Sequence, residues 1–178
     1  MLLTACATPA PRSTAPDAIA AAPPLTGRIA LVVAATPQQA ARSASAGFEW
    51  SGDGTAGTLV LSTAVGTRMA EARWRPGLVE LSTPDGTSQF DTLESLAERL
   101  LGERLPMQAL ADWLRGRPWP GAAVEPLPAG PASTPRRSFR QSGWEVDLSR
   151  HAEGRIEARR REPPPAVELR IRLDPDAP

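Results

Sequence analysis

Residues 91–121 read DTLESLAERLLGERLPMQALADWLRGRPWPG and carry the clearest helical pattern in the chain. Apolar residues recur there every three or four positions, first from Leu93 to Leu101 and again from Met107 to Leu114. This spacing predicts two short amphipathic helices. A large apolar side chain contributes roughly 1.5–3 kcal/mol when fully buried, so the helices need a surface to pack against. The strand-rich segments on either side are expected to form that surface.

The expected ends of these helices carry typical capping residues. Asp91, with Glu94 three positions later, has the pattern of a capping box. Gly102 is typical of the left-handed residue that ends a helix. Pro106 fits the first turn of the second helix, where its missing N–H costs no hydrogen bond. We expect Gly116 to end that helix.

Alternating apolar and polar residues on both sides of the helices predict β-strands. We expect strands near residues 27–33, 47–50, 58–61, 67–74, 78–82, 139, 144–148, 155–161 and 167–173, and connections at 36–45 and 119–135. In the strand 67–74, the set Arg68, Ala70, Ala72 and Trp74 is expected to face inward. The order strands, helices, strands indicates an α+β fold in which helices cover one face of a curved antiparallel sheet.

The composition excludes several classes of protein. The chain has 178 residues, a net charge of zero, five Trp and no Tyr. Without a basic excess there is no reason to expect a nucleic-acid partner. No apolar run approaches the roughly 20 residues needed to span a membrane. We expect one folded domain at residues 25–178.

The sequence contains no recognisable catalytic motif, so neither an enzyme nor a cofactor-binding protein is expected. One His and one Cys are too few for the usual metal sites, and no nucleophile is paired with a base. We expect His151, in a polar stretch, to be an exposed surface residue. The arginines at 155 and 159–161 alternate with apolar residues and Glu, which predicts the solvated face of a strand. The sequence therefore favours a binding function.

The N-terminal segment resembles that of a bacterial lipoprotein. Leu3-Thr4-Ala5-Cys6 matches a lipobox, which is cut before a cysteine that becomes acylated, and Cys6 is the only cysteine. We expect residues 1–5 to be the remnant of a signal peptide and residues 6–24 to be the lipidated cysteine with a flexible tether. A stray cysteine in a disordered leader is the alternative. Ala7 stands where Asp would retain such a lipoprotein in the inner membrane, which implies the outer membrane.

Five short motifs follow one another along the rest of the chain. They are Gly27-Arg28-Ile29-Ala30, Phe48-x-Trp50, Leu100-Leu101-Gly102…Leu105-Pro106, Trp113-Leu114-Arg115-Gly116-x-Pro118-x-Pro120 and Gln141-x-Gly143-Trp144-x-Val146. Together with the lipobox, they resemble the LolB family of outer-membrane lipoprotein receptors. The resemblance covers roughly residues 27–173.

The resemblance implies an unclosed β-barrel of about ten strands with helices lidding an apolar cavity, as in LolA/LolB-like proteins. It implies a monomeric receptor without cofactors, lipid-anchored at the periplasmic face of the outer membrane. Such a receptor takes acylated lipoproteins from a LolA-like periplasmic carrier and inserts them into outer-membrane lipid. The expected cavity lining is Ile29, Leu31, Phe48, Trp50, Leu59, Trp74, Leu96, Leu100, Trp113, Leu114 and Trp144. Ordinary core packing is the alternative for each of these residues.

Val65 is the expected membrane-insertion tip. The family usually carries Gly-Pro-Leu-Gly in this hairpin, with an exposed leucine that delivers cargo into the membrane, whereas Ala64 and Val65 stand here for the Pro and Leu. A smaller side chain and a less rigid turn imply weaker insertion. An ordinary turn is the alternative. Leu148 replaces a common Tyr and the usual terminal aromatic is missing, so the last strand is expected to contribute less to the cavity than in the family.

Two other functions fit the same residues. A lipocalin-like envelope lipoprotein would bind another amphiphile, such as a free lipid, and uptake that depends on a carrier would separate it from a receptor. A structural envelope lipoprotein would hold a partner protein without an open cavity, and an apolar dye would then fail to bind. A hydrolase is disfavoured because the nucleophile–base pair is missing.

Overall fold

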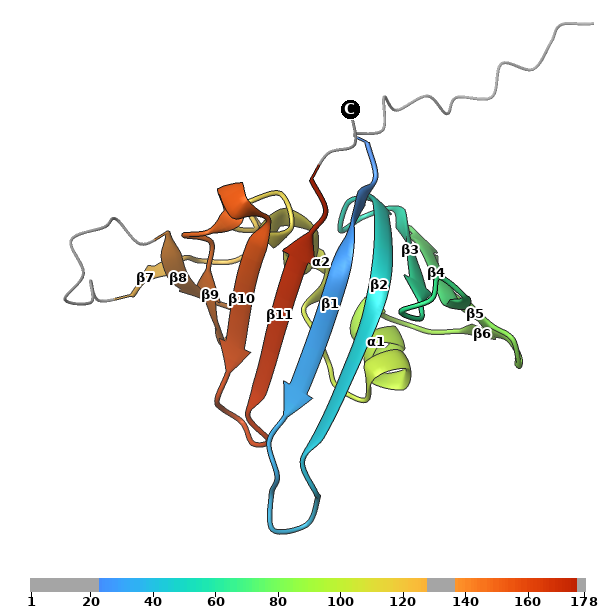
Figure 1. Cartoon of the computed structure of the whole chain (residues 1–178), viewed down its shortest axis with the longest axis horizontal. Helices are drawn as coiled ribbons and strands as arrows, with labels where there is room; N and C mark the ends of the chain where they lie inside the picture. Colours follow the sequence, from blue (N-terminus) through green and yellow to red (C-terminus); the bar gives the residue numbers. More distant parts are fainter. Residues whose placement is uncertain (1–22, 128–136, 176–178) are drawn as a thin grey trace, which may run out of the picture.

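The computed structural model describes residues 23–127 and 137–175, which form one antiparallel sheet and two short helices (Figure 1). The expected signal-peptide remnant, Cys6 and almost all of the expected tether lie outside the described residues. The elements, in chain order, are β1 (Leu25–Val33), β2 (Arg42–Gly52), β3 (Gly57–Ser62), β4 (Arg68–Arg75), β5 (Leu78–Thr83), β6 (Gly86–Gln89), α1 (Leu93–Leu101), α2 (Met107–Trp113), β7 (Glu125–Pro126), β8 (Ser138–Gln141), β9 (Trp144–Asp147), the 3-10 helix η1 (His151–Glu153), β10 (Arg155–Arg160) and β11 (Val167–Leu173).

The sheet has eleven strands in the order β6-β5-β4-β3-β2-β1-β11-β10-β9-β8-β7. It is not closed into a barrel, because β6 and β7 remain at its two edges. The first and last strands meet at its centre, where β1 pairs with β11 from Gly27–Leu173 to Val33–Val167. The chain between the two edges carries both helices, which lie on one face of the curved sheet (Figure 1). The predicted α+β fold, with helices over an unclosed antiparallel sheet, is confirmed.

Side-chain alternation determines which strand positions face the helices. In β4, Ala70, Ala72 and Trp74 are buried and Arg73 is exposed, as the pattern predicts. Arg68 was expected on the inner face but is exposed, because it is the first residue of its strand. The inner faces of the strands and the apolar faces of α1 and α2 form one continuous hydrophobic core.

The helix ends confirm one predicted cap and correct two. Gly102 is the C-cap of α1 and has a φ of 73°, in the left-handed region that favours glycine. α2 ends earlier than predicted, at Trp113 with Leu114 as its C-cap, and Gly116 takes the same φ of 73° in the turn that follows. The capping box of α1 is one residue later than predicted, with Thr92 in place of Asp91. Ser95 donates its backbone N–H to the Thr92 hydroxyl at 3.1 Å, and Ser95 Oγ accepts the Thr92 N–H at 3.3 Å. With this cap Leu93 is the first helical residue and is buried.

Three smaller expectations need correction. β2 begins at Arg42, within the expected connection 36–45, because its backbone continues the ladder with β1 although its side chains are small or polar. Pro106 is the N-cap of α2 and not its first residue. His151 is half-buried rather than exposed, and its Nε2 lies 3.0 Å from the carbonyl oxygen of Leu114. In the part of the chain that the structure describes, no helix has the length and apolarity to cross a membrane.

Candidate functional site

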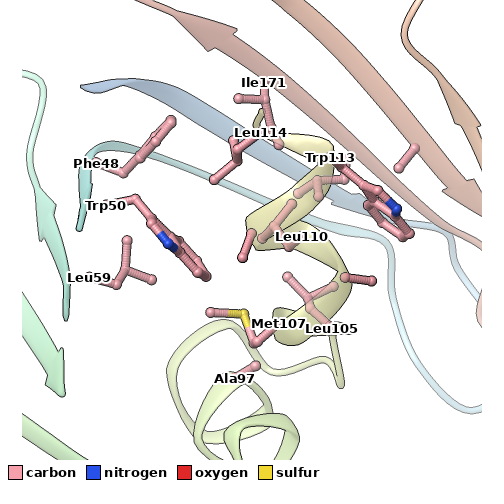
Figure 2. Packing of buried hydrophobic residues seen from close by; sticks show 14 of the residues in the cluster. Phe48, Trp50, Leu59, Ala97, Leu105, Met107, Leu110, Trp113, Leu114 and Ile171 are labelled. Atoms are coloured by element: carbon pink, nitrogen blue, oxygen red, sulfur yellow. The ribbon is translucent and has the colours of Figure 1, made fainter. Parts of the chain in front are cut away.

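A small apolar cavity lies between the inner face of the sheet and the helices, in the region of Figure 2. Its volume is about 20 Å³. Strands β1, β2, β3 and β11 form one wall, and the end of α1, the following turn and α2 form the other. All of its wall residues are hydrophobic: Ile29, Phe48, Trp50, Leu59, Leu61, Leu101, Leu105, Met107, Leu110, Leu114 and Ile171.

The structure places the predicted lining residues in three locations. Those in the cavity wall are Ile29, Phe48, Trp50, Leu59 and Leu114. Those in the surrounding core are Leu31, Trp74, Leu96 and Leu100, of which Trp74 packs on Trp50 with 5.0 Å between ring centroids. The remaining two, Trp113 and Trp144, form a second aromatic pair outside the wall, with centroids 6.4 Å apart.

Six wall residues were not in the predicted lining: Leu61, Leu101, Leu105, Met107, Leu110 and Ile171. Sequence periodicity could have found some of these, since Leu61 follows Leu59 at strand spacing and Leu110 lies on the predicted apolar helix face. Leu105 lies between the helices, where no periodicity applies. Its place in the wall depends on how the turn packs.

The buried tryptophans differ in the hydrogen bonding of their indole N–H groups. Trp74 donates to the carbonyl oxygen of Asp53 at 2.8 Å, and Trp113 donates to Gln141 Oε1 at 3.0 Å. Trp50 Nε1 is buried and has no hydrogen-bond partner among the described residues. Asp53 is itself held in its turn by backbone N–H groups of Ala56 and Thr55, which lower the pKa of its carboxyl.

Gln141 is the buried polar side chain of the core, and all its hydrogen-bonding capacity is used. Its Oε1 accepts the Trp113 indole N–H and the Trp119 backbone N–H, both at 3.0 Å. Its Nε2 donates to the carbonyl oxygens of Trp119 at 2.7 Å and Ala122 at 2.9 Å. Gln141 therefore fixes α2 and the segment after it to β8. Gln141 belongs to one of the sequence motifs that resemble the LolB family, but its role in holding the helix was not predicted.

A wider, open hollow of about 430 Å³ lies beside the apolar cavity. Leu105 lines both spaces, so its fully buried side chain is part of the partition between them. Trp144 and Arg160 also line the open hollow, with the Arg160 guanidinium 5.6 Å from the centroid of the Trp144 ring.

Two arginines hold the turn between the helices onto the sheet. Arg42 of β2 contacts Glu103 at 2.7 Å, and Arg160 of β10 contacts the other oxygen of the same carboxylate at 3.1 Å. Arg42 also donates to the carbonyl oxygen of Gly102. We call Arg42, Glu103 and Arg160 the clasp. Arg160 was expected on a solvated strand face, but its side chain is only 14% exposed because it turns inward to reach Glu103.

The turn between β3 and β4 presents a single large apolar side chain to solvent. Val65 is 88% exposed at this turn. Thr63 shapes the turn, because its Oγ1 accepts the Thr67 backbone N–H at 3.1 Å and its carbonyl oxygen accepts the Gly66 N–H at 3.0 Å. An apolar residue so placed can reach a surface that the turn touches.

The sequence of the chain is similar to those of known proteins that share one name. The family described as "Outer membrane lipoprotein LolB" matches residues 24–175. An "Outer-membrane lipoprotein LolB" of Bordetella petrii is 35% identical over 96% of this chain and 85% of that relative. Proteins of the same name from Bordetella pertussis and Dechloromonas aromatica are 35% and 32% identical, each over 70% of this chain and 62% and 64% of their own lengths. The chain belongs to the LolB family of outer-membrane lipoproteins.

Proposed function

We propose that this protein accepts acylated lipoproteins from a LolA-type carrier and inserts them into the outer membrane. The observation that carries the proposal is a cavity with wholly hydrophobic walls, covered by two helices that a polar clasp holds to the sheet. Membership of the LolB family supports the same function.

The physical chemistry of the cargo explains the need for such a cavity. An acyl chain gains about 0.8 kcal/mol per methylene on leaving water, so a triacylated anchor needs shelter on its way between membranes. The receptor has to bind this anchor more tightly than the carrier does and less tightly than the bilayer. The lipoprotein then moves at each step to the partner that binds it more tightly, and no nucleotide is needed.

The cavity has to expand to hold an acyl chain. A dry apolar cavity that binds benzene has a volume of roughly 150 Å³, far above the 20 Å³ enclosed here. We propose that α1 and α2 move away from the sheet, and that displacement of Leu105 joins the cavity to the adjacent hollow. The clasp would then have to open, since it holds the turn that carries Leu105.

The finer parts of the function rest on the sequence. We propose that Cys6 carries the lipid anchor and that the folded part faces the periplasm as a monomer. We also propose that Val65 enters the bilayer surface during delivery, which its exposure on the β3–β4 turn supports.

A transfer assay tests the proposal. A soluble form that begins after Cys6 is mixed, without ATP, with a carrier loaded with a labelled triacylated lipoprotein, and the two proteins are then separated. The label is expected on the soluble form. Failure to transfer from a competent carrier to folded protein would contradict the receptor function. Carrier-independent uptake of free phospholipid would then favour a lipid-binding lipoprotein.

A further inference from the structure

Trp50 carries a polar group that the fold does not use. Its side chain is only 1% exposed, it forms part of the wall of the apolar cavity, and its Nε1 has no hydrogen-bond partner among the described residues. Most buried polar atoms in proteins have such a partner. The neighbouring indoles follow this rule, since Trp74 donates to Asp53 and Trp113 donates to Gln141.

Neither the protein nor a water molecule offers a good acceptor for this N–H. The side chains around the cavity are all hydrophobic. A space of about 20 Å³ has room for one water, but a buried water needs two to four polar partners. The Trp74 ring lies 5.0 Å away at 60° and could at most offer its π face, which is a weak acceptor. An unpartnered donor costs free energy in this closed arrangement.

A bound lipoprotein anchor brings its own acceptors. Its hydrocarbon chains have none, but each chain joins the anchor through an ester or amide carbonyl. When the helices move off the sheet, the Trp50 wall is among the surfaces that face the expanded cavity. An N–H group in apolar surroundings then meets a carbonyl oxygen with no water competing for either.

We propose that Trp50 is the specificity-determining residue of the cavity, and that its indole N–H donates a hydrogen bond to a carbonyl oxygen of the acyl linkages. The inference rests on the proposed lipoprotein-binding function and adds to it a preference for acyl over alkyl chains. The hydrophobic wall holds chains of either kind. Trp50 distinguishes a chain attached through a carbonyl group from one attached without it.

Two lipopeptides of matched size test this preference. One carries S-dipalmitoylglyceryl cysteine with two ester carbonyls, and the other carries the ether-linked S-dihexadecylglyceryl group; the amino group of the cysteine is left unacylated in both. The soluble protein is expected to bind the ester form roughly 3- to 10-fold more tightly, the range that one hydrogen bond supplies. In Trp50→Phe the preference should disappear, because both lipopeptides lose the same apolar contact whereas only the ester form loses a hydrogen bond.

Trp74→Phe is the matched control. Both substitutions remove the same atoms from a buried tryptophan, but only Trp74 loses a hydrogen bond, the one to Asp53. We expect Trp74→Phe to keep the ester preference and to lower the melting temperature more than Trp50→Phe does. If Trp50→Phe lowers the melting temperature as much as Trp74→Phe does, or more, the fold already satisfies the Trp50 N–H, and the proposal is overturned.

The indole N–H resonance of Trp50 gives a direct readout. In ¹H–¹⁵N spectra it should move downfield on adding the ester lipopeptide, and much less with the ether form. Equal affinities of the two lipopeptides for the native protein, or an unchanged preference in Trp50→Phe, would contradict the carbonyl contact. Absence of binding to either lipopeptide would instead contradict the proposed function, which the carrier transfer assay tests separately.

Discussion

At the scale of single residues, the buried polar groups differ in whether they have a partner: among the described residues, Trp50 Nε1, Arg42 Nε and Arg160 Nε are buried without one. Gln141 uses both of its amide hydrogens and its oxygen to fix α2 and the segment after it to β8. Trp74 and Trp113 each have a protein acceptor, whereas Trp50 has none among the described residues. Trp50 lines the cavity where the proposed ligand binds, so its free N–H can take a partner from the ligand.

Val65 allows a prediction at this same scale. Changing Val65 to Glu should leave uptake from the carrier intact and slow release into vesicles at least about tenfold, because a carboxylate enters lipid poorly. Changing it to Leu should speed release about fourfold, from roughly 0.8 kcal/mol for one more methylene. The measurement is transfer of a labelled lipoprotein, first to the soluble protein and then to vesicles.

Val124→Glu is the matched control for that experiment. Val124 is 45% exposed and lies just before β7, at the edge of the sheet away from the β3–β4 turn. The Val124→Glu variant should release cargo at the native rate. If Val65→Glu loses uptake and release equally, or neither, the turn has no special role in delivery.

At the scale of elements, the helices are held by two kinds of contact. Their apolar faces are buried in the core, and the clasp ties the turn between them to β2 and β10. The apolar contacts are non-directional and can re-form around a hydrocarbon chain. The clasp is directional and is lost when the turn moves, so it favours the closed arrangement.

Replacing Glu103 with Gln should therefore loosen the helices. Both arginine contacts lose their charge partner, which should lower the free energy of unfolding by about 1–3 kcal/mol. Amide hydrogens of α2 should exchange roughly tenfold faster in the native state. Glu98→Gln is the control, because its pair with Arg104 is largely exposed and contributes little. Equal exchange rates in the two variants would show that the clasp does not restrain the helices.

At the scale of the whole molecule, the unclosed sheet is accompanied by two different spaces, the apolar cavity and the open hollow beside it. One is small and apolar, the other wider and partly charged, and Leu105 belongs to the walls of both. Because β6 and β7 do not pair, no hydrogen-bonded ladder joins the two edges of the sheet. We propose that an acyl chain passes from the open hollow into the core beside Leu105, which lines both spaces.

Leu105→Ala tests the route. Truncating this buried side chain should cost about 2–5 kcal/mol in stability and join the two spaces, so that an apolar fluorescent dye binds severalfold faster. Leu96→Ala should cost a similar amount, since Leu96 is equally buried, but Leu96 lines neither space. Stopped-flow dye binding and chemical denaturation measure both effects. Equal dye kinetics in the two variants would rule out entry past Leu105.

Much of the fold could be predicted from local patterns. Strand alternation identified Ala70, Ala72 and Trp74 as inward-facing, and helical spacing with Gly102 located α1. The cavity wall was harder to predict, because core and cavity residues share one pattern of hydrophobicity. Leu96 and Leu114 look alike in sequence, yet only Leu114 reaches the cavity.

The sequence by itself determined the class of fold, the ends of α1 and the start of α2 to within a residue, the resemblance to the LolB family and the exposed Val65. Tertiary structure alone decided how distant segments meet. Pairing of β1 with β11 joins the two ends of the chain, and Glu103 gathers Arg42 and Arg160 from strands on either side of that pair. The physical reason is that periodicity specifies which face a side chain occupies, whereas its partners depend on packing between residues far apart in the chain.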